Sequence, residues 1–139
     1  PGVNYNDSRV FAYFAKCSKE KKNIVLKTKG ETERSYLYTL DAATAILVVM
    51  LKGETGQAYN AADESTYCSI AEMAKMIASD SEIQVEFDIQ DTSANGFADT
   101  LYMDLDTSSL RKLGWAPTKR KTLNQMYARL IDAWKNVHE

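Results

Sequence analysis

The chain has 139 residues, which suits one ordinary globular domain and is short for two. Apolar residues make up 45% and charged residues 26%, a composition that excludes a disordered or collagenous chain. The net charge of −2 offers no basic footprint for nucleic acid or an anionic membrane, and the single histidine, His138, excludes histidine-dependent triads and histidine-ligated zinc.

The first part of the chain predicts a helix followed by a strand. Apolar residues recur at helical spacing from Asp7 or Ser8 onward, and the basic run Lys19 to Lys22 suits the last turn of such a helix. Apolar and polar residues then alternate over Asn23 to Lys27, which predicts a short strand before a turn at Lys29-Gly30.

The next segment predicts a strongly apolar helix between two short strands. Ser35 to Thr39 is expected to be extended or a second strand, because its tyrosines fall on one face. Asp41 is expected to cap a helix over Ala42 to Leu51, which is closed at Gly53. This helix is apolar nearly all round, so we expect it to be the buried central helix of the domain. Gln57 to Asn60 is expected to form a brief strand.

The second half predicts two capped helices on either side of a strand. Ser69-Ile70-Ala71-Glu72 and Thr122-Leu123-Asn124-Gln125 are capping boxes, and each begins a segment with helical spacing of apolar residues. Their expected core positions are Ile70, Met73, Ala74, Ile77, Leu123, Met126, Tyr127, Leu130, Ile131 and Trp134. Alternation over Ile83 to Ile89 gives the clearest strand in the chain, residues 90–103 are ambiguous, and Asp106 is expected to begin a short helix.

These elements predict one domain over residues 1–139, with a mixed α/β (α+β) fold in which helices pack on a few short strands. Cys17 and Cys68 form no CxxC pair, which favours two reduced thiols in a cytoplasmic protein. The longest apolar stretch, Ala42 to Leu51, is far shorter than the ~20 residues that a membrane span needs. We therefore expect a soluble protein with no membrane partner.

The sequence lacks the motifs that most often carry catalysis. It has no glycine-rich phosphate loop, so the Rossmann fingerprint for a dinucleotide is missing. None of its tyrosines has a lysine four residues later, and no GxSxG nucleophile elbow occurs. Acidic pairs such as Asp104 and Asp106 have no calcium-loop spacing. No catalytic residue, bound cofactor or metal is therefore expected in this chain.

A ligand-binding role is considered for the segment that contains Arg34 and Tyr36. An arginine two residues before an aromatic ring can present its planar donor fork to a phosphate while the ring supports a base or sugar. A surface arginine beside an ordinary tyrosine ladder is the alternative. Arg9 offers a second basic group near the N–H groups that begin the first helix, and Asn60 is expected to cap or hydrogen-bond locally.

Five segments of the sequence occur in an order that matches one known enzyme family. Residues 34–43 read Arg-Ser-Tyr-Leu-Tyr-Thr-Leu-Asp-Ala-Ala, and residues 58–60 read Ala-Tyr-Asn. The other three are Asn-Asp-Ser-Arg-Val at 6–10, the helical segment 69–78, and the run from Asp-Thr-Ser to Leu-Gly-Trp-Ala-Pro at 106–117. In this order they resemble the C-terminal half of the NAD-dependent epimerase/dehydratase family, the extended short-chain dehydrogenases that act on nucleotide sugars.

The resemblance implies a substrate-binding lobe that closes over a nucleotide sugar held against an NAD-bearing Rossmann lobe. In such a lobe Arg34 would contact the diphosphate and Tyr36 would support it. The other site residues that the resemblance implies are Ile24, Val25 and Lys27 at the nucleotide base, with Arg9 and Asn60 as weaker matches. The family commonly has an arginine in the stretch corresponding to residues 88–104, whereas residues 91–102 of this chain contain no Lys or Arg.

The leading hypothesis is therefore the substrate-binding lobe of an NAD-dependent nucleotide-sugar epimerase, dehydratase or decarboxylase. We expect this lobe to be inert alone, with a nucleotide sugar and a missing N-terminal Rossmann lobe as partners and with NAD bound only by the complete enzyme. The alternative is a non-enzymatic module that binds a nucleotide or another protein. Because the surface toward the Rossmann lobe would be apolar and exposed, either hypothesis allows self-association into a homo-oligomer.

Overall fold

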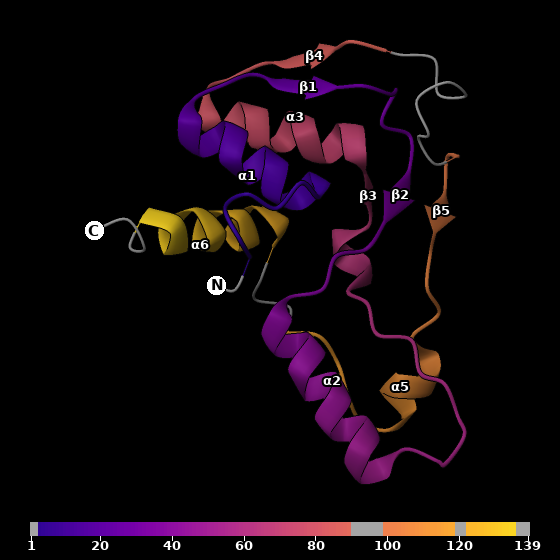
Figure 1. Ribbon diagram of the computed structural model, residues 1–139. Helices are drawn as coiled ribbons and strands as arrows, with labels where there is room; N and C mark the ends of the chain where they lie inside the picture. Colours follow the sequence, from indigo (N-terminus) through magenta and orange to yellow (C-terminus); the bar gives the residue numbers. More distant parts are fainter. Residues whose placement is uncertain (1–2, 90–98, 119–121, 136–139) are drawn as a thin grey trace.

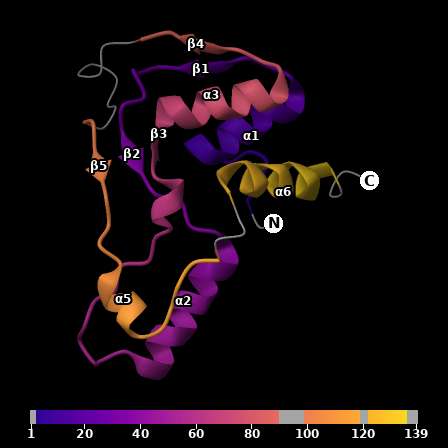
Figure 2. The same ribbon diagram turned by 180° about the vertical axis from the view of Figure 1, so that it is seen from behind.

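The computed structural model describes residues 3–89, 99–118 and 122–135 of the chain (Figure 1). Its helices fall into two groups, which Figures 1 and 2 show from opposite sides. The first group consists of α1 (Val10–Glu20), α3 (Ile70–Ser81) and α6 (Leu123–Lys135). The second group consists of α2 (Thr39–Lys52) and the short α5 (Ser108–Lys112).

Two small sheets join these helices. One sheet has the parallel strands β1 (Ile24–Leu26) and β4 (Val85–Phe87). In the other, β2 (Glu33–Arg34) is the middle strand, antiparallel to β3 (Cys68–Ser69) and parallel to β5 (Tyr102–Met103). A short 3₁₀ helix, Glu64–Thr66, precedes β3. The mixed α and β class with a few short strands is thus confirmed.

The main hydrophobic core lies among α1, α3, α6 and β1. The capping box predicted for α3 is present, because Ser69 Oγ accepts a hydrogen bond from the Glu72 N–H at 3.1 Å and the Glu72 carboxylate accepts one from the Ser69 N–H at 2.8 Å. Thr122 and Gln125 cap α6 in the same way. The predicted core positions that are buried are Met73, Ala74, Ile77, Leu123, Met126, Tyr127, Leu130 and Trp134. The two predicted helices therefore form as their local signals require.

The helix α1 begins at Val10, after the start predicted at Asp7 or Ser8. The Asp7 carboxylate accepts a hydrogen bond from the Arg9 N–H at 2.9 Å, which holds this segment in a local turn. Arg9 is then extended, with φ −65° and ψ 146°, and the helix follows it. The late start places the first turn of α1 beside a cavity described below.

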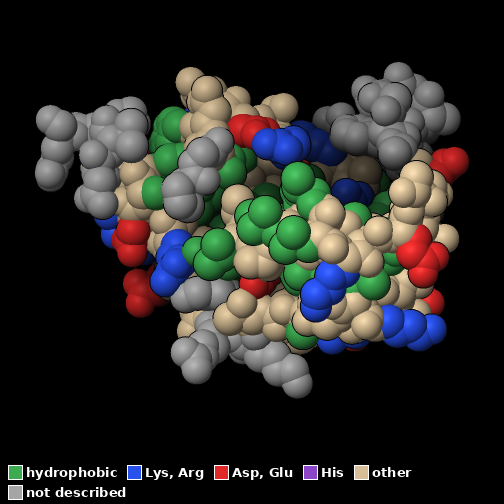
Figure 3. All heavy atoms as spheres, turned by 90° about the horizontal axis from the view of Figure 1, so that it is seen from below, with side chains coloured by type: hydrophobic (Ala, Val, Ile, Leu, Met, Phe, Trp, Pro, Cys, Tyr) green, Lys and Arg blue, Asp and Glu red, His purple; other side chains and the backbone are tan. Residues whose placement is uncertain are grey.

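The helix α2 is not the buried central helix that its apolar sequence predicts. Only Asp41 and Ala45 of this helix are buried. Its exposed apolar residues are Leu40, Ile46, Leu47, Met50 and Leu51, and Leu51 is 82% exposed. A small second core, formed by Ala45, Leu110 and Trp115, covers one side of α2. Figure 3 shows hydrophobic side chains gathered in the middle of the face seen from below, where α2 lies.

Asp41 does not cap α2, because the helix begins two residues earlier at Thr39. The buried Asp41 carboxylate instead accepts a hydrogen bond of 2.5 Å from the Thr118 hydroxyl, and the Asp41 carbonyl accepts one of 3.2 Å from Trp115 Nε1. Asp41 therefore joins the first turn of α2 to the segment that leads into α6. The predicted end of the helix at Gly53 is confirmed.

Three strand predictions differ from the structure. No strand forms over Ser35 to Thr39, which was expected to be extended or a second strand. The strand pairing occurs just before this segment, in β2. Gln57 to Asn60 forms no strand, because no described strand lies beside it to complete a ladder. Only Val85–Phe87 of the strand predicted over Ile83 to Ile89 pairs, and Phe87 is 49% exposed, because β1 is its one neighbour among the described strands.

Both cysteines are present as free thiols, with Cys17 buried and Cys68 half-buried. Within the described ranges, no helix has both the length and the apolar character needed to cross a bilayer. The same ranges contain no group of three His, Cys, Asp or Glu side chains that is arranged to hold a metal ion.

Candidate functional site

A cavity of about 550 Å³ lies where the start of α1, the end of β2 and one side of α6 meet. Its lining is formed by Val3, Asp7, Ser8, Arg9, Val10, Phe11, Ala12, Arg34, Tyr36, Leu37, Tyr38, Thr39, Ile70, Met126 and Leu130. Most of these side chains are apolar, and the charged ones are two arginines and one aspartate. The cavity brings together three of the predicted site residues, Arg9, Arg34 and Tyr36.

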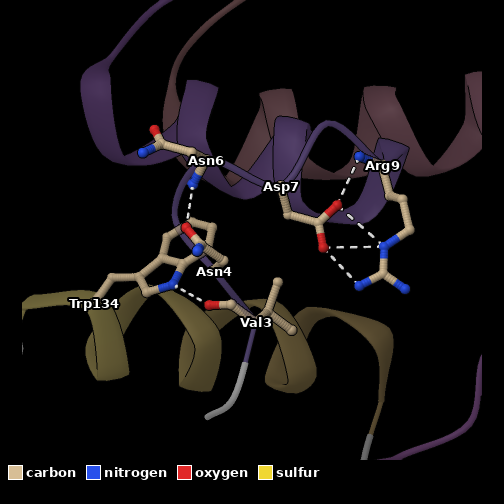
Figure 4. Close-up of polar contacts among 6 residues, drawn as sticks. All are labelled: Val3, Asn4, Asn6, Asp7, Arg9 and Trp134. Carbon is tan, nitrogen blue, oxygen red and sulfur yellow. Dashed lines mark hydrogen bonds and ion pairs between the residues drawn. The ribbon is translucent and has the colours of Figure 1, made fainter.

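The N-terminal segment places Arg9 at this cavity through a series of contacts that Figure 4 shows. Trp134 Nε1 on α6 donates a hydrogen bond to the Val3 carbonyl at 2.8 Å. Asn4 accepts hydrogen bonds from the Asn6 N–H through its side chain and from the Asp7 N–H through its carbonyl. These contacts attach residues 3–7 to the last helix and fix where the Asp7 carboxylate lies.

Asp7 in turn orients the guanidinium of Arg9. Its carboxylate accepts from Arg9 Nε at 3.0 Å and from Nη2 at 2.5 Å (Figure 4). The Arg9 side chain is 80% exposed, and Nη1 has no acceptor among the described residues, so that edge of the guanidinium faces outward with its donors available. Hydrogen bonds from Arg9 lower the pKa of Asp7 to about 2, and the same contact raises the pKa of Arg9. The pair is thus ionised throughout the ordinary pH range.

Two helices begin at the cavity without a side-chain cap. Arg9 is the residue before α1 and Tyr38 the residue before α2, and neither side chain accepts a hydrogen bond from its helix. Both residues line the cavity. The first N–H groups of a helix carry partial positive charge and need an acceptor, so an uncapped helix start favours an anion nearby. The start of α3 differs, because its capping box supplies that acceptor.

Arg34 and Tyr36 follow one another along the wall of the cavity. Arg34 ends β2 and is exposed, and no carboxylate lies within ion-pair distance of it in the described part of the chain. The backbone N–H and carbonyl of Tyr36 both bond to the Thr66 hydroxyl at 2.7 Å, which fixes the ring beside Phe11 at a centroid distance of 5.8 Å. Burial raises the pKa of Tyr36 to about 12, so its hydroxyl stays neutral. The wall therefore offers an unpaired cation next to a neutral aromatic ring.

The other four predicted site residues lie outside this cavity. Ile24, Val25 and Lys27 belong to or follow β1, on the far side of the main core. Ile24 is fully buried, and the Lys27 ammonium pairs with the Asp88 carboxylate. Asn60 donates to the Asp106 carbonyl at 3.1 Å, a contact across 46 positions of sequence, so the prediction of a local cap or hydrogen bond for it is wrong. The structure therefore does not gather these four residues around the same ligand space as Arg34.

Sequence reasoning missed the contribution of α6 to the cavity. Met126 and Leu130 were expected only in the core, but they also close one side of the cavity. Phe11 and Tyr38 line it too, and Phe11 stacks on the buried Tyr127 at a centroid distance of 4.0 Å. A pattern at helical spacing shows which residues point inward, but it does not tell a packed core from the wall of a cavity.

A second cavity of about 890 Å³ lies near the 3₁₀ helix and the start of α6, and its chemistry is less favourable for a ligand. Its arginine, Arg111, pairs with Glu64 at 3.3 Å, and Glu64 also accepts from the Thr107 hydroxyl at 2.7 Å. The Thr107 hydrogen bond and the charge of Arg111 lower the pKa of Glu64. Burial raises the pKa of Cys68, so this thiol is protonated and a weak nucleophile.

Comparison with known proteins identifies the family of this chain. Residues 1–62 match the model of the NAD-dependent epimerase/dehydratase family. Over 117 residues the chain is 32% identical to the trifunctional UDP-glucose 4,6-dehydratase/UDP-4-keto-6-deoxy-D-glucose 3,5-epimerase/UDP-4-keto-L-rhamnose-reductase of Arabidopsis thaliana. The chain belongs to the NAD-dependent epimerase/dehydratase family. This epimerase/dehydratase chain spans only part of its relatives, since the Arabidopsis match covers 82% of the chain and 17% of the relative.

Solved structures show the same fold at lower sequence identity. The UDP-glucose 4-epimerase of Thermotoga maritima, solved with UDP-glucose, matches 97% of this chain and 42% of its own length, with a TM-score of 0.78 and 19% identity. The RMD protein of Pseudomonas aeruginosa, complexed with NADPH, matches 98% of this chain and 45% of its own, with a TM-score of 0.77 and 20% identity. The family resemblance expected from the five sequence segments is therefore confirmed.

Proposed function

We propose that this chain is the C-terminal, substrate-binding lobe of an NAD-dependent nucleotide-sugar epimerase, dehydratase or decarboxylase. The observation that carries the proposal is the cavity where Arg9 and Arg34 meet two uncapped helix starts. The chain as a whole has a net charge of −2, so this local excess of positive groups is not a consequence of composition. A diphosphate flanked by a nucleoside and a sugar complements such a cavity in charge and in its apolar wall.

In this proposal Arg34, Arg9 and Tyr36 have different roles in binding the substrate. The Arg34 guanidinium contacts the diphosphate with its planar fork, and the Arg9 donors that Asp7 does not use contact it from the start of α1. The Tyr36 ring supports the ligand by contact, since its hydroxyl stays neutral. Holding the substrate in one orientation is the contribution that such a lobe makes to hydride transfer between sugar and NAD.

The residues of this chain do not fit NAD itself. A dinucleotide cradle needs a glycine-rich turn from a strand into a helix, and the junction of β3 with α3 is instead closed by the capping box of Ser69 and Glu72. That junction has no glycine, and no glycine-rich phosphate loop occurs in the sequence. In the proposal, NAD is therefore held by another part of the complete enzyme, and the chain alone is inert.

Substitution of Arg34 tests the proposed function. We expect calorimetry to detect binding of UDP or dTDP by the wild-type chain. Arg34→Ala is expected to weaken this binding by about 1.5–3 kcal/mol, the scale of a hydrogen bond to a charged group. Arg111→Ala is the matched control, because Arg111 is also a surface arginine but pairs with Glu64 outside the cavity. If no nucleotide binds at millimolar concentration, or if both variants bind like the wild type, the proposed function is wrong.

The exposed apolar face of α2 favours a second candidate function, a non-enzymatic module that associates with a second copy of itself. Ile46, Leu47, Met50 and Leu51 are each more than half exposed. Ile46 and Leu47 lie three to five residues before Met50 and Leu51 on one helix, so the two pairs fall on neighbouring turns, as in the ridges by which helices pack. Contiguous exposed apolar surface of this kind marks an interaction site.

Self-association through α2 is tested by adding charge to its exposed face. We expect the wild-type chain to form dimers as its concentration rises, and Leu47→Lys combined with Met50→Lys to keep it monomeric, because two lysines cannot be buried unpaired. Gln57→Lys combined with Gln84→Lys adds the same charge at exposed sites outside α2 and serves as the control. Light scattering after size exclusion measures the mass. A wild-type chain that stays monomeric contradicts this candidate.

A further inference from the structure

The helix α6 brings a third arginine into contact with a lining residue of the cavity. Arg129 lies on α6 between Met126 and Leu130, which both line the cavity. Its Nη1 donates a hydrogen bond of 2.7 Å to the hydroxyl of Tyr38, another lining residue, across 91 positions of sequence. The guanidinium carbon is also 5.8 Å from the centre of the Tyr38 ring. Arg129 does not itself line the cavity, but these contacts hold its guanidinium against a residue that does.

The charge of Arg129 is not neutralised by a carboxylate in the described part of the chain. Arg9 and Lys135 differ in this respect, because Arg9 pairs with Asp7 at 2.5 Å and Lys135, on the same helix as Arg129, pairs with Asp132 at 3.1 Å. The hydrogen-bond acceptor of Arg129 is instead the hydroxyl of Tyr38. A guanidinium has five N–H donors, so the single bond to Tyr38 leaves donors for an anion without any rearrangement.

Arg34 and Arg129 are thus two guanidinium groups without a carboxylate partner, one in the wall of the cavity at the end of β2 and one on α6, bonded to the lining residue Tyr38. Among the lining residues the one carboxylate is that of Asp7, and Arg9 already compensates its charge. An apolar cavity edged by two such cations attracts a ligand that carries more than one negative charge, because each cation lowers the energy of a separate anionic group.

We propose that Arg129 is a ligand-contacting, specificity-determining residue of this site, which binds the anionic part of a nucleoside diphosphate from α6. The inference rests on the proposed function and extends it to a residue of α6. Tyr38 acts as the positioning residue, since its hydroxyl holds the guanidinium beside a side chain that lines the cavity. The site then selects a diphosphate over an uncharged nucleoside.

The experiment compares charged and uncharged ligands. Binding of UDP and of uridine is measured by NMR titration of the full 139-residue chain, for the wild type, Arg129→Gln and Lys135→Gln. Arg129→Gln is expected to lower the affinity for UDP about tenfold, the effect of losing one charge-assisted hydrogen bond, and to leave uridine binding unchanged. Lys135→Gln removes a cation from the same helix away from the cavity and is expected to change neither affinity.

Two further variants separate the role of the Tyr38 hydroxyl from that of the Arg129 guanidinium. Tyr38→Phe keeps the ring but removes the hydroxyl, so it is expected to weaken UDP binding by a smaller factor than Arg129→Gln does. Arg129→Lys keeps the charge without the planar fork and is expected to recover part of the lost affinity. Because Arg129 is exposed, thermal unfolding should show that these variants remain folded.

Each outcome of these binding measurements supports or overturns the role proposed for Arg129. If Arg34→Ala weakens UDP binding while Arg129→Gln does not, the proposed function stands and the role of Arg129 is overturned. Equal losses for UDP and uridine would mean that Arg129 only supports the wall through Tyr38, which also overturns it. If the wild type binds neither ligand, the proposed function fails, and the inference fails with it.

Discussion

Substitution of Tyr127 by alanine is expected to lower the free energy of unfolding by about 3–5 kcal/mol, the cost of truncating a large buried aromatic side chain. Tyr127 lies on α6, is 2% exposed and stacks on Phe11 at a centroid distance of 4.0 Å with 18° between the rings. Its hydroxyl contacts Met73 Sδ at 3.3 Å. The ring thus fills the space between three helices, and no small movement of any one of them can close the cavity left behind.

Tyr127→Phe is the matched control for this prediction. It keeps the stacked ring and removes only the contact with sulfur, so the expected loss is below about 1 kcal/mol. Burial raises the pKa of Tyr127 far above its usual range, so the hydroxyl is neutral and its loss removes no charge. Urea denaturation monitored by circular dichroism measures both variants. Similar losses for Ala and Phe would contradict the view that the ring, and not the hydroxyl, carries the stability.

Tyr127 also links the core to the candidate site. Phe11 lies between Tyr127 and Tyr36, with centroid distances of 4.0 Å and 5.8 Å, so the ring that lines the cavity rests on the ring that fills the core. Loss of Tyr127 removes the support of Phe11. Ligand binding should therefore weaken in Tyr127→Ala even at temperatures where the variant stays folded, and Tyr127→Phe should bind like the wild type.

The parts of the fold that the sequence predicts well are those that local chemistry determines. The Ser69 and Glu72 capping box uses groups three residues apart, so its presence is readable from the sequence, and α3 begins where it predicts. The same holds for Thr122 and Gln125 before α6. In both helices most of the expected apolar positions are buried, because a stripe at helical spacing has one side that can face a core.

The parts that the sequence predicts poorly depend on distant partners. The apolar helix α2 has residues that suit burial on every side, but the described chain provides only Leu110, Trp115 and their neighbours to cover it. Gln57 to Asn60 has strand-like residues and no described strand beside it. Conversely, β2 forms at Glu33–Arg34 because β3 and β5 pair with it from both sides. Such pairings cannot be read from one segment alone.

The residues of the candidate site also divide into those that a local pattern predicts and those that depend on distant partners. Arg34 and Tyr36 are two residues apart, so a local pattern was sufficient to select them, and both line the cavity. Arg129 is 91 positions from Tyr38 and gives no local signal of its position. The β1 residues that the family resemblance implied as a base site lie outside this cavity, and their proposed role stays a prediction.

Gly30→Ala is expected to lower the free energy of unfolding by about 2–4 kcal/mol, the sum of a left-handed residue and an overpacked contact. Its φ is +70°, a value that L side chains rarely adopt. A Cβ at this position would lie 2.9 Å from the backbone N and 3.1 Å from the Cβ of Ala71, in the first turn of α3. That backbone cannot move away easily, because the Ala71 N–H also donates to the Gly30 carbonyl at 3.0 Å.

Gly56→Ala separates the two causes, since Gly56 has a φ of +82° but would place its Cβ in open space. It should therefore cost only the conformational part, about 1–2 kcal/mol. Equal losses in urea denaturation would show that the approach of Ala71 adds nothing. The turn at Gly30 leads directly into β2, whose Glu33 pairs with Ser69 at the start of α3. Because the position of Arg34 depends on that pairing, Gly30→Ala should weaken nucleotide binding as well as stability, whereas Gly56→Ala should leave binding unchanged.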